Sequence, residues 1–247
     1  MRVAVVSDIH GNLAALEAVI ADLRSTAPDL VLQAGDTAVL GPRPAEVVDR
    51  LRELAWPALA GNTDQMLWEP AVRTEQERRA PRLRSWLDVL FGALGPWAAE
   101  RLGGERLDWL RSLPEERRAA GVRVVHASPG DLWRAPMPDA PDAELARTYG
   151  GAREGIAVYG HIHRPFVREL PGLIVVNCGS VGLPWDGDPR AAYLLVDDGR
   201  PSIRRVEYDM ERACRDLAAA GFPLPGWLET GLREARFSRP EPPSAPR

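Results

Sequence analysis

Short apolar runs alternate with helical patterns along the first part of the chain. Residues 2–7, "RVAVVS", form a continuous apolar run, which is typical of a strand that is buried on both faces. The apolar positions from Leu13 to Leu23 then repeat with helical spacing after a possible cap at Asn12. The elements predicted next are a strand at 29–36, a helix at 44–55 that a proline opens, and a strand at 56–62. The pattern therefore predicts βα units.

The second part of the chain returns to strands after a long helical stretch. Residues 66–116 are rich in tryptophan and arginine and are predicted to form a helical insertion. The strands predicted after it lie at 122–126, 155–161, 173–177 and 191–198. Two helices, at about 210–220 and 226–237, precede a proline-rich and charged end that predicts a flexible tail at 238–247. We expect a single α/β domain over residues 1–237.

Polar residues stand where the predicted strands end. They are Asp8, His10, Asp36, Asn62, His126, His161 and His163, and they include all four histidines of the chain. Ligands bind at the carboxyl ends of strands in open α/β sheets. Because residues i and i+2 of a strand share a face, Asp8/His10 and His161/His163 could each aim two side chains at one point. A single histidine here would more simply be a hydrogen-bonding group, but four beside carboxylates and an amide predict a site for zinc, manganese or iron.

Composition and charge narrow the class of protein. The chain has 247 residues, of which 45% are apolar, and this is enough for a full core. Its net charge of −4 gives no large positive field, which argues against nucleic acid as a partner. No apolar run reaches membrane-spanning length and no targeting segment is visible, so we expect a cytoplasmic protein without a membrane partner. The two cysteines, Cys178 and Cys214, form neither a disulfide framework nor a metal-knuckle spacing.

Several short motifs occur in a fixed order along the chain. They are "DIHGN" (8–12), "GDTAVLGP" (35–42), "GNTD" (61–64), a strand-end histidine at 126 and "GHIHRPF" (160–166). This order resembles the calcineurin-like metallophosphoesterases. The segment 177–199, which begins "NCGSVG", further resembles their small bacterial and archaeal phosphodiesterase-like branch. The likeness covers about residues 1–205 and implies a four-layer α-β-β-α sandwich.

The resemblance also implies a site with two divalent metal ions. One ion would be held by Asp8, His10, Asp36 and His163, and the other by Asp36, Asn62, His126 and His161. Asp36 would bridge the ions and hold a hydroxide between them, which would attack phosphorus in line. No nucleophilic side chain is then needed. Cys178 and Ser180 would instead belong to a glycine-rich turn packed beneath the site.

The chain departs from the commoner family pattern at Thr63. Many members carry a histidine after the asparagine, where it is proposed to protonate the leaving group. A threonine hydroxyl can donate a hydrogen bond, but it is too weakly acidic to replace an imidazolium at neutral pH. We therefore expect phosphodiesters with good leaving groups to be favoured over alkyl phosphate monoesters. Asp64 either orients Thr63 or His126, or caps the chain that follows.

Other functions on the same fold stay open. The substrate is expected to be a small phosphoester, and a phosphomonoesterase is the alternative to a phosphodiesterase. A protein-binding scaffold, such as the retromer subunit with this fold, would show lost ligands, and none is lost here. A nuclease like the double-strand-break repair members would show a basic channel and an added DNA-binding domain, and neither is apparent. The insertion and the loops near Trp133 and Trp185 are expected to set the substrate, and nothing in the pattern indicates an oligomeric state.

Overall fold

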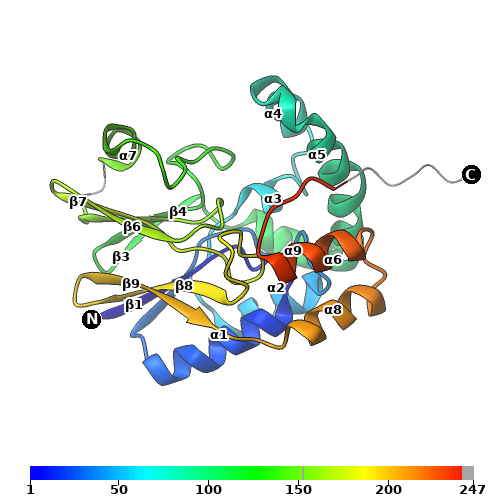
Figure 1. The fold of residues 1–247 in the computed structure, drawn as a ribbon, viewed down its shortest axis with the longest axis horizontal. Coiled ribbons are helices and arrows are strands. Elements are labelled where there is room, and N and C mark those ends of the chain that lie inside the picture. Colours follow the sequence, from blue (N-terminus) through cyan, green and yellow to red (C-terminus); the bar gives the residue numbers. More distant parts are fainter. Residues whose placement is uncertain (152, 241–247) are drawn as a thin grey trace, which may run out of the picture.

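The computed structural model describes residues 1–151 and 153–240, and it contains two β-sheets packed face to face (Figure 1). The first sheet has the strand order β2-β1-β8-β9. Its strands are β1 (Arg2–Val6), β2 (Leu30–Gln33), β8 (Ala191–Asp197) and β9 (Arg200–Val206). Strand β1 pairs in parallel with β2 and antiparallel with β8, which in turn pairs antiparallel with β9. The sheet therefore pairs the first strand of the chain with a strand from its last pair, β8 and β9.

The second sheet has the strand order β3-β4-β5-β7-β6. Its strands are β3 (Glu116–Ala119), β4 (Val122–Val125), β5 (Ile156–Tyr159), β6 (Phe166–Leu170) and β7 (Leu173–Asn177). The three central strands are parallel, and the two edge strands pair antiparallel with their neighbours. The central strands are short apolar runs because both of their faces are covered.

Helices cover the outer face of each sheet. Helices α1 (Leu13–Thr26) and α2 (Pro44–Leu54) pack on the first sheet, and α7 (Asp142–Tyr149) packs on the second. Along β1, Val3 and Val5 contact the second sheet, whereas Ala4 and Val6 contact the helices. Successive positions of this strand are apolar because each face meets a different core. Burial of one such side chain contributes about 1.5–3 kcal/mol. The predicted four-layer α-β-β-α arrangement is confirmed.

A helical region follows the first βα units. Its elements are α3 (Asn62–Gln65), α4 (Val72–Arg79), a 3₁₀ turn at Pro81–Leu83, α5 (Arg84–Val89), a π-helical turn at Leu90–Leu94 and α6 (Gly95–Arg111). Helices α8 (Met210–Ala219) and α9 (Pro225–Glu234) share one apolar cluster with this region. Leu90 and Leu94 contribute to that cluster from one side, and Leu217 and Leu228 from the other. The segment is helical as expected, while the limits 1–237 and 66–116 stay predictions of domain organisation.

The prediction of a strand at 56–62 is wrong. This run makes one isolated bridge, between Ala58 and Gln33, after which Ala60 donates its N–H to the carbonyl of Pro114 and the chain turns into α3. Strands β3, β6 and β9 and helix α7 were not predicted from the pattern. The three strands lie at sheet edges and carry charged residues at partly or fully exposed positions, which hide the apolar alternation.

The remaining predictions about the chain have different outcomes. The cap at Asn12 is confirmed, since its side chain accepts a hydrogen bond of 3.1 Å from the N–H of Ala15. Of the tail predicted at 238–247, residues 241–247 lie outside the described part of the chain. None of the helices in the described part combines the length and the apolar character that a bilayer crossing requires.

Candidate metal centre

Loops at one edge of the two sheets bring the predicted site residues together. Asp8 and His10 follow β1, Asp36 follows β2, Asn62 begins α3, His126 follows β4, and His161 and His163 follow β5. His161 is partly buried and the others are buried. Buried polar groups of this kind need partners, because an unpaired one costs free energy. The edge therefore gathers carboxylates, imidazoles and an amide in a small buried volume.

Most of these residues have left-handed backbone conformations. The φ angles are 53° for Asp8, 50° for His10, 54° for Asp36, 66° for His161 and 55° for His163. The pairs Asp8/His10 and His161/His163 therefore converge through loop conformation beyond the strand ends, and the strand alternation that we invoked is not the cause. Each such residue costs about 1–2 kcal/mol. Strain of this kind gathers at functional sites, where the surrounding structure holds it.

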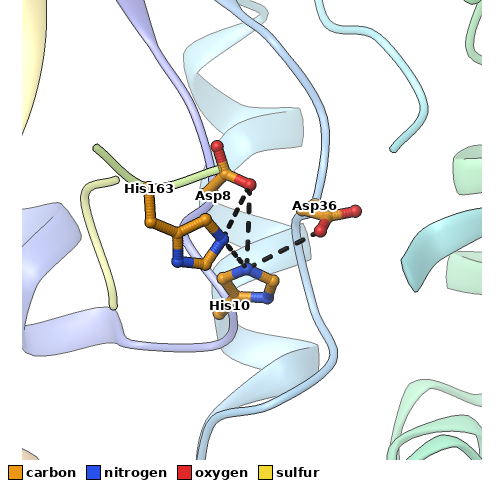
Figure 2. A group of neighbouring side chains, drawn as sticks. All are labelled: Asp8, His10, Asp36 and His163. Atoms are coloured by element: carbon orange, nitrogen blue, oxygen red, sulfur yellow. Dashed lines mark hydrogen bonds and ion pairs between the residues drawn. The ribbon is translucent and has the colours of Figure 1, made fainter. Parts of the chain in front are cut away.

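One group of four side chains lies closest together (Figure 2). Asp8, His10, Asp36 and His163 offer ligand atoms that all lie within 4.8 Å of one another. Nε2 of His163 is 3.1 Å from Oδ1 of Asp8 and 3.1 Å from Nε2 of His10. Nε2 of His10 is also 3.6 Å from Oδ2 of Asp36. The structure thus brings together the four residues that the resemblance assigns to one ion.

A second group lies on the other side of Asp36. Oδ1 of Asn62 is 2.9 Å from Nε2 of His126 and 2.9 Å from Nδ1 of His161. Nε2 of His126 is 3.5 Å from Oδ1 of Asp36. Asp36 therefore turns Oδ2 toward the first group and Oδ1 toward the second. A carboxylate placed in this way has the geometry that a bridge between two cations requires.

The protons on the imidazoles decide whether the site suits a cation. In three of the histidines, Nδ1 donates to a backbone carbonyl, at 2.7 Å from His10 to Val39, 2.8 Å from His126 to Ala34 and 2.5 Å from His163 to Leu183. A neutral imidazole has one N–H, so Nε2 of each ring carries a lone pair. The Nε2 lone pairs of His10 and His163 then face each other. The donor set fits a metal ion in each group, because a cation relieves this repulsion and backbone carbonyls orient the rings.

The ionisation states agree with this fit. Burial lowers the pKa of His10 to about 4 and the pKa of His161 to about 4, which leaves both rings neutral at pH 7. Burial alone would raise the pKa of Asp8, but positive charge on the neighbouring imidazoles, His163 first, holds it well below its usual range, so protons on these rings supply the positive charge that a bound cation would replace. Burial works against protonation of His126, yet the carboxylate of Asp36 raises its pKa. The site thus attracts positive charge while it keeps most ligands in their metal-binding form.

Asp64 is fully buried, and the hydrogen bonds that its carboxylate makes within the described residues come from backbone N–H groups. Its carboxylate accepts hydrogen bonds of 3.0 Å from the N–H of Thr37 and 3.0 Å from the N–H of Gly61. These contacts agree with the second of the two roles considered for Asp64, which is to cap the chain. They also connect the loop of Asp36 to the turn of Asn62. Burial, followed by the charge of Asp36, raises the pKa of Asp64 to about 7.

Thr63 contacts both Asp36 and the open side of the site. Its N–H donates to Oδ1 of Asp36 at 2.9 Å. Its Oγ1 is buried, and it has no hydrogen-bond partner among the described residues, although the residue lines a cavity. An unpartnered buried hydroxyl is uncommon in folded proteins. The hydroxyl therefore lies beneath the surface of the cavity, and a bound molecule would meet it only after the side chain turned toward the cavity.

Two glycines allow the ligands to approach other chain segments closely. A Cβ on Gly61 would lie 2.1 Å from Oδ1 of Asp36, and a Cβ on Gly160 would lie 2.4 Å from Oδ2 of Asp8. Neither position tolerates a side chain, because both distances are far below van der Waals contact. We did not assign a role to these residues from the sequence. The signal was present, since each glycine directly precedes a predicted ligand in "GN" and "GH".

The turn that contains Cys178 and Ser180 lies beneath the first group, as expected. Oγ of Ser180 donates to the carbonyl of Asp8 at 2.7 Å and accepts from the N–H of Leu183 at 2.8 Å. Cys178 is fully buried, and burial raises the pKa of its thiol above the usual range. Neither residue lines the cavity over the site. Both therefore support the ligand loops and neither is placed as a nucleophile.

A cavity of about 1010 Å³ opens over the site. Asp36, Asn62 and Thr63 form part of its base, and Trp133 and Trp185 belong to its walls. Trp185 also stacks on the ring of His163, with 3.7 Å between the ring centres. Binding pockets for small molecules have volumes of about 300–1,000 Å³. The cavity is therefore much larger than a phosphate group alone requires.

Known proteins resemble the chain over most of its length. It is 31% identical to the uncharacterized protein MJ0912 of Methanocaldococcus jannaschii, over 92% of this chain and 95% of that one. It is 25% identical to the phosphodiesterase YfcE of Escherichia coli, over 82% of this chain and 91% of that one. A crystal structure of a metallophosphoesterase from Sphaerobacter thermophilus superposes with a TM-score of 0.76 at 28% identity, covering 95% of this chain and all of that one. Residues 1–199 match the calcineurin-like phosphoesterase superfamily domain, and the chain belongs to that family.

Proposed function

We propose that the chain is a dinuclear metal-dependent phosphoesterase that hydrolyses small phosphodiesters in preference to phosphate monoesters. The placement of Asp36 carries this proposal, since each of its carboxylate oxygens faces a different group of ligands. Family membership supports the reaction class, and the relative named as a phosphodiesterase supports the preference for diesters. None of the predicted ligands is lost, which disfavours a scaffold without catalytic activity.

The residues of the chain have separate tasks in this proposal. Asp8, His10 and His163 would hold one ion with Asp36, and Asn62, His126 and His161 would hold the other with Asp36. Two bound divalent ions of manganese, zinc or iron would activate water as the nucleophile and neutralise charge on the phosphoryl oxygens. The hydroxyl of Thr63 would donate a hydrogen bond to a substrate oxygen.

The metal content of the purified protein tests the proposal. Because two groups of ligands share one carboxylate, we expect about two divalent ions per chain after reconstitution with manganese. Elemental analysis would measure the ions, and a chelator should abolish hydrolysis of a nitrophenyl phosphodiester. The Asn62→Ala variant is the control, since it should lose one ion and keep the other. Trace metal in the reconstituted protein, with activity that a chelator does not change, would contradict the proposal.

The rate is expected to depend steeply on the basicity of the leaving group, because Thr63 cannot protonate the departing oxygen. General acid catalysis is worth about 10²–10⁴-fold. Nitrophenyl phosphodiesters should therefore turn over, while alkyl phosphate monoesters should lag by about that factor beyond their intrinsic difference. Rates across a graded series of leaving groups, with chemistry rate-limiting, would measure this dependence.

Two substitutions at the same position make the comparison sharper. Thr63→His should reduce the dependence on the leaving group, because an imidazolium can supply the proton. Thr63→Val removes the hydroxyl and keeps the shape, so it should slow all substrates by a similar factor and leave the slope unchanged. Rates in the unaltered protein that do not change with the basicity of the leaving group would show that another acid is present. His126 and Asp64 would be the next candidates.

A further inference from the structure

The walls of the cavity over the metal centre are aromatic and come from distant parts of the chain. Trp86 lies on α5, Trp133 follows β4, Trp185 follows β7, and Phe237 follows α9. Figure 1 shows the segment after α9 running toward α5. Trp86, Trp133 and Trp185 lie within residues 1–199, which match the family, whereas Phe237 lies beyond them. The walls thus combine loops that also support the predicted ligands with the helical region and the segment after α9.

The aromatic side chains hold one another in place. The ring of Phe237 is 4.9 Å from Trp185 and 5.5 Å from Trp86. Trp133 stacks on Phe91 at 6.0 Å, and its Nε1 donates to Oε1 of Gln65 at 2.7 Å. Rings fixed in this way lose little conformational freedom when a ligand binds. The walls therefore form a prepared surface for a flat apolar group.

The same cavity has an excess of positive charge. Asp36 is the sole carboxylate among the described residues that line it, while five arginines do so. Arg79 is paired with Glu75 and Asp131, but Arg82, Arg134 and Arg164 have no ion pair within the described part of the chain. The protein as a whole has a net charge of −4, and most of its ion pairs lie elsewhere on the surface. Arginines without carboxylates around one cavity indicate an anionic ligand.

We propose that the cavity binds a nucleotide with at least two phosphates, an inference that rests on the proposed function. The base would stack on Trp133 or Trp86, because every base has a flat π face on which an aromatic side chain can stack. The reacting phosphate would lie at Asp36 and Thr63. A further phosphate would lie at Arg82 and Arg134, because guanidinium groups match phosphate oxygens in geometry and charge.

Calorimetric titration of the full-length protein tests this inference. ADP, AMP, adenosine, pyrophosphate and ribose 5-phosphate would be compared on the manganese-loaded protein, because the ions neutralise the carboxylates beside the reacting phosphate, and ADP and pyrophosphate would be supplied as their non-hydrolysable methylene analogues. We expect AMP to bind about tenfold or more tightly than ribose 5-phosphate, because only AMP has a base to stack. ADP should bind about tenfold more tightly than AMP, because it carries a further charged group. Adenosine and pyrophosphate should each bind more weakly than ADP.

Variants separate the two parts of the cavity. Trp133→Leu should weaken AMP and leave ribose 5-phosphate unchanged. Arg82→Gln and Arg134→Gln lie at exposed positions, and they should weaken ADP more than AMP. Arg24→Gln, on the exposed side of α1, is the matched control and should change nothing. Equal affinities for ADP and ribose 5-phosphate, or arginine variants that bind ADP as the unaltered protein does, would overturn the inference.

The proposed function can fail separately from this inference. Hydrolysis of a nitrophenyl phosphodiester by the manganese-loaded protein, without any preference for ADP over ribose 5-phosphate, would overturn the nucleotide site alone. Binding of ADP with the expected order, without hydrolysis of any phosphoester, would overturn the proposed activity and leave the binding site in place.

Discussion

The Asp36→Asn variant is expected to hydrolyse phosphodiesters about 10³-fold more slowly or worse. Metal ions supply several kcal/mol of stabilisation to the transition state, and each 1.36 kcal/mol is a factor of about ten in rate. Asparagine keeps the shape of the side chain but lacks the negative charge, so one residue change weakens both groups of ligands. Steady-state rates with manganese in excess, together with the metal content of the variant, would measure the effect.

Asn62→Ala is the comparison for this variant, because Asn62 contacts His126 and His161 on one side of Asp36 only. Its loss of activity should be at least about tenfold smaller, since one ion keeps all its ligands. Equal and mild losses in both variants, with metal retained, would mean that the bridging role is misassigned to Asp36.

The Gly61→Ala variant is expected to lose activity on a similar scale, about 10³-fold, although no ligand is replaced. The new methyl group would lie 2.1 Å from Oδ1 and 2.3 Å from the backbone nitrogen of Asp36, so the bridging carboxylate has to move. Because Gly61 also donates its N–H to Asp64, the turn that carries Asn62 should shift as well. Metal content and hydrolysis rate should fall together.

Gly104→Ala is a matched control in α6. A Cβ there has no heavy atom within 4 Å, so neither the activity nor the folding of the variant should change. A Gly61→Ala protein that binds two ions and keeps its rate would show that the loop of Asp36 has room to adjust. Circular dichroism of both variants would establish that each is folded.

Much of the fold could be predicted because its strands are buried on both faces. A run such as "VAVV" (3–6) is apolar at every position only where two different cores meet, and this property is local to the sequence. Edge strands do not have it. In β9, "RPSIRRV", three arginines interrupt the apolar pattern, and the pairing with β8 supplies the hydrogen bonds that make it a strand.

The residues of the site could be predicted from the sequence, but their geometry could not. Polar residue types after apolar runs are visible in a sequence, and so are the short motifs that they form. The left-handed conformation of His10 is not, because it depends on hydrogen bonds such as the one from its N–H to the carbonyl of Asp36. The loops near Trp133 and Trp185 line the cavity, as the expectation that they set the substrate requires, but the contribution of Phe237 was hidden, since it meets the other rings only after the chain has folded.

The left-handed ligand residues set activity and stability against each other. Glycine adopts this backbone conformation without the steric cost that aspartate and histidine carry. At these positions the backbone of a glycine would therefore be less strained in the folded state. Selection of variants for heat resistance alone would not preserve an aspartate or a histidine at such a position, and any relief of the backbone strain would come with a loss of the chemistry. A search for a more robust form of this protein therefore needs a functional screen at every round.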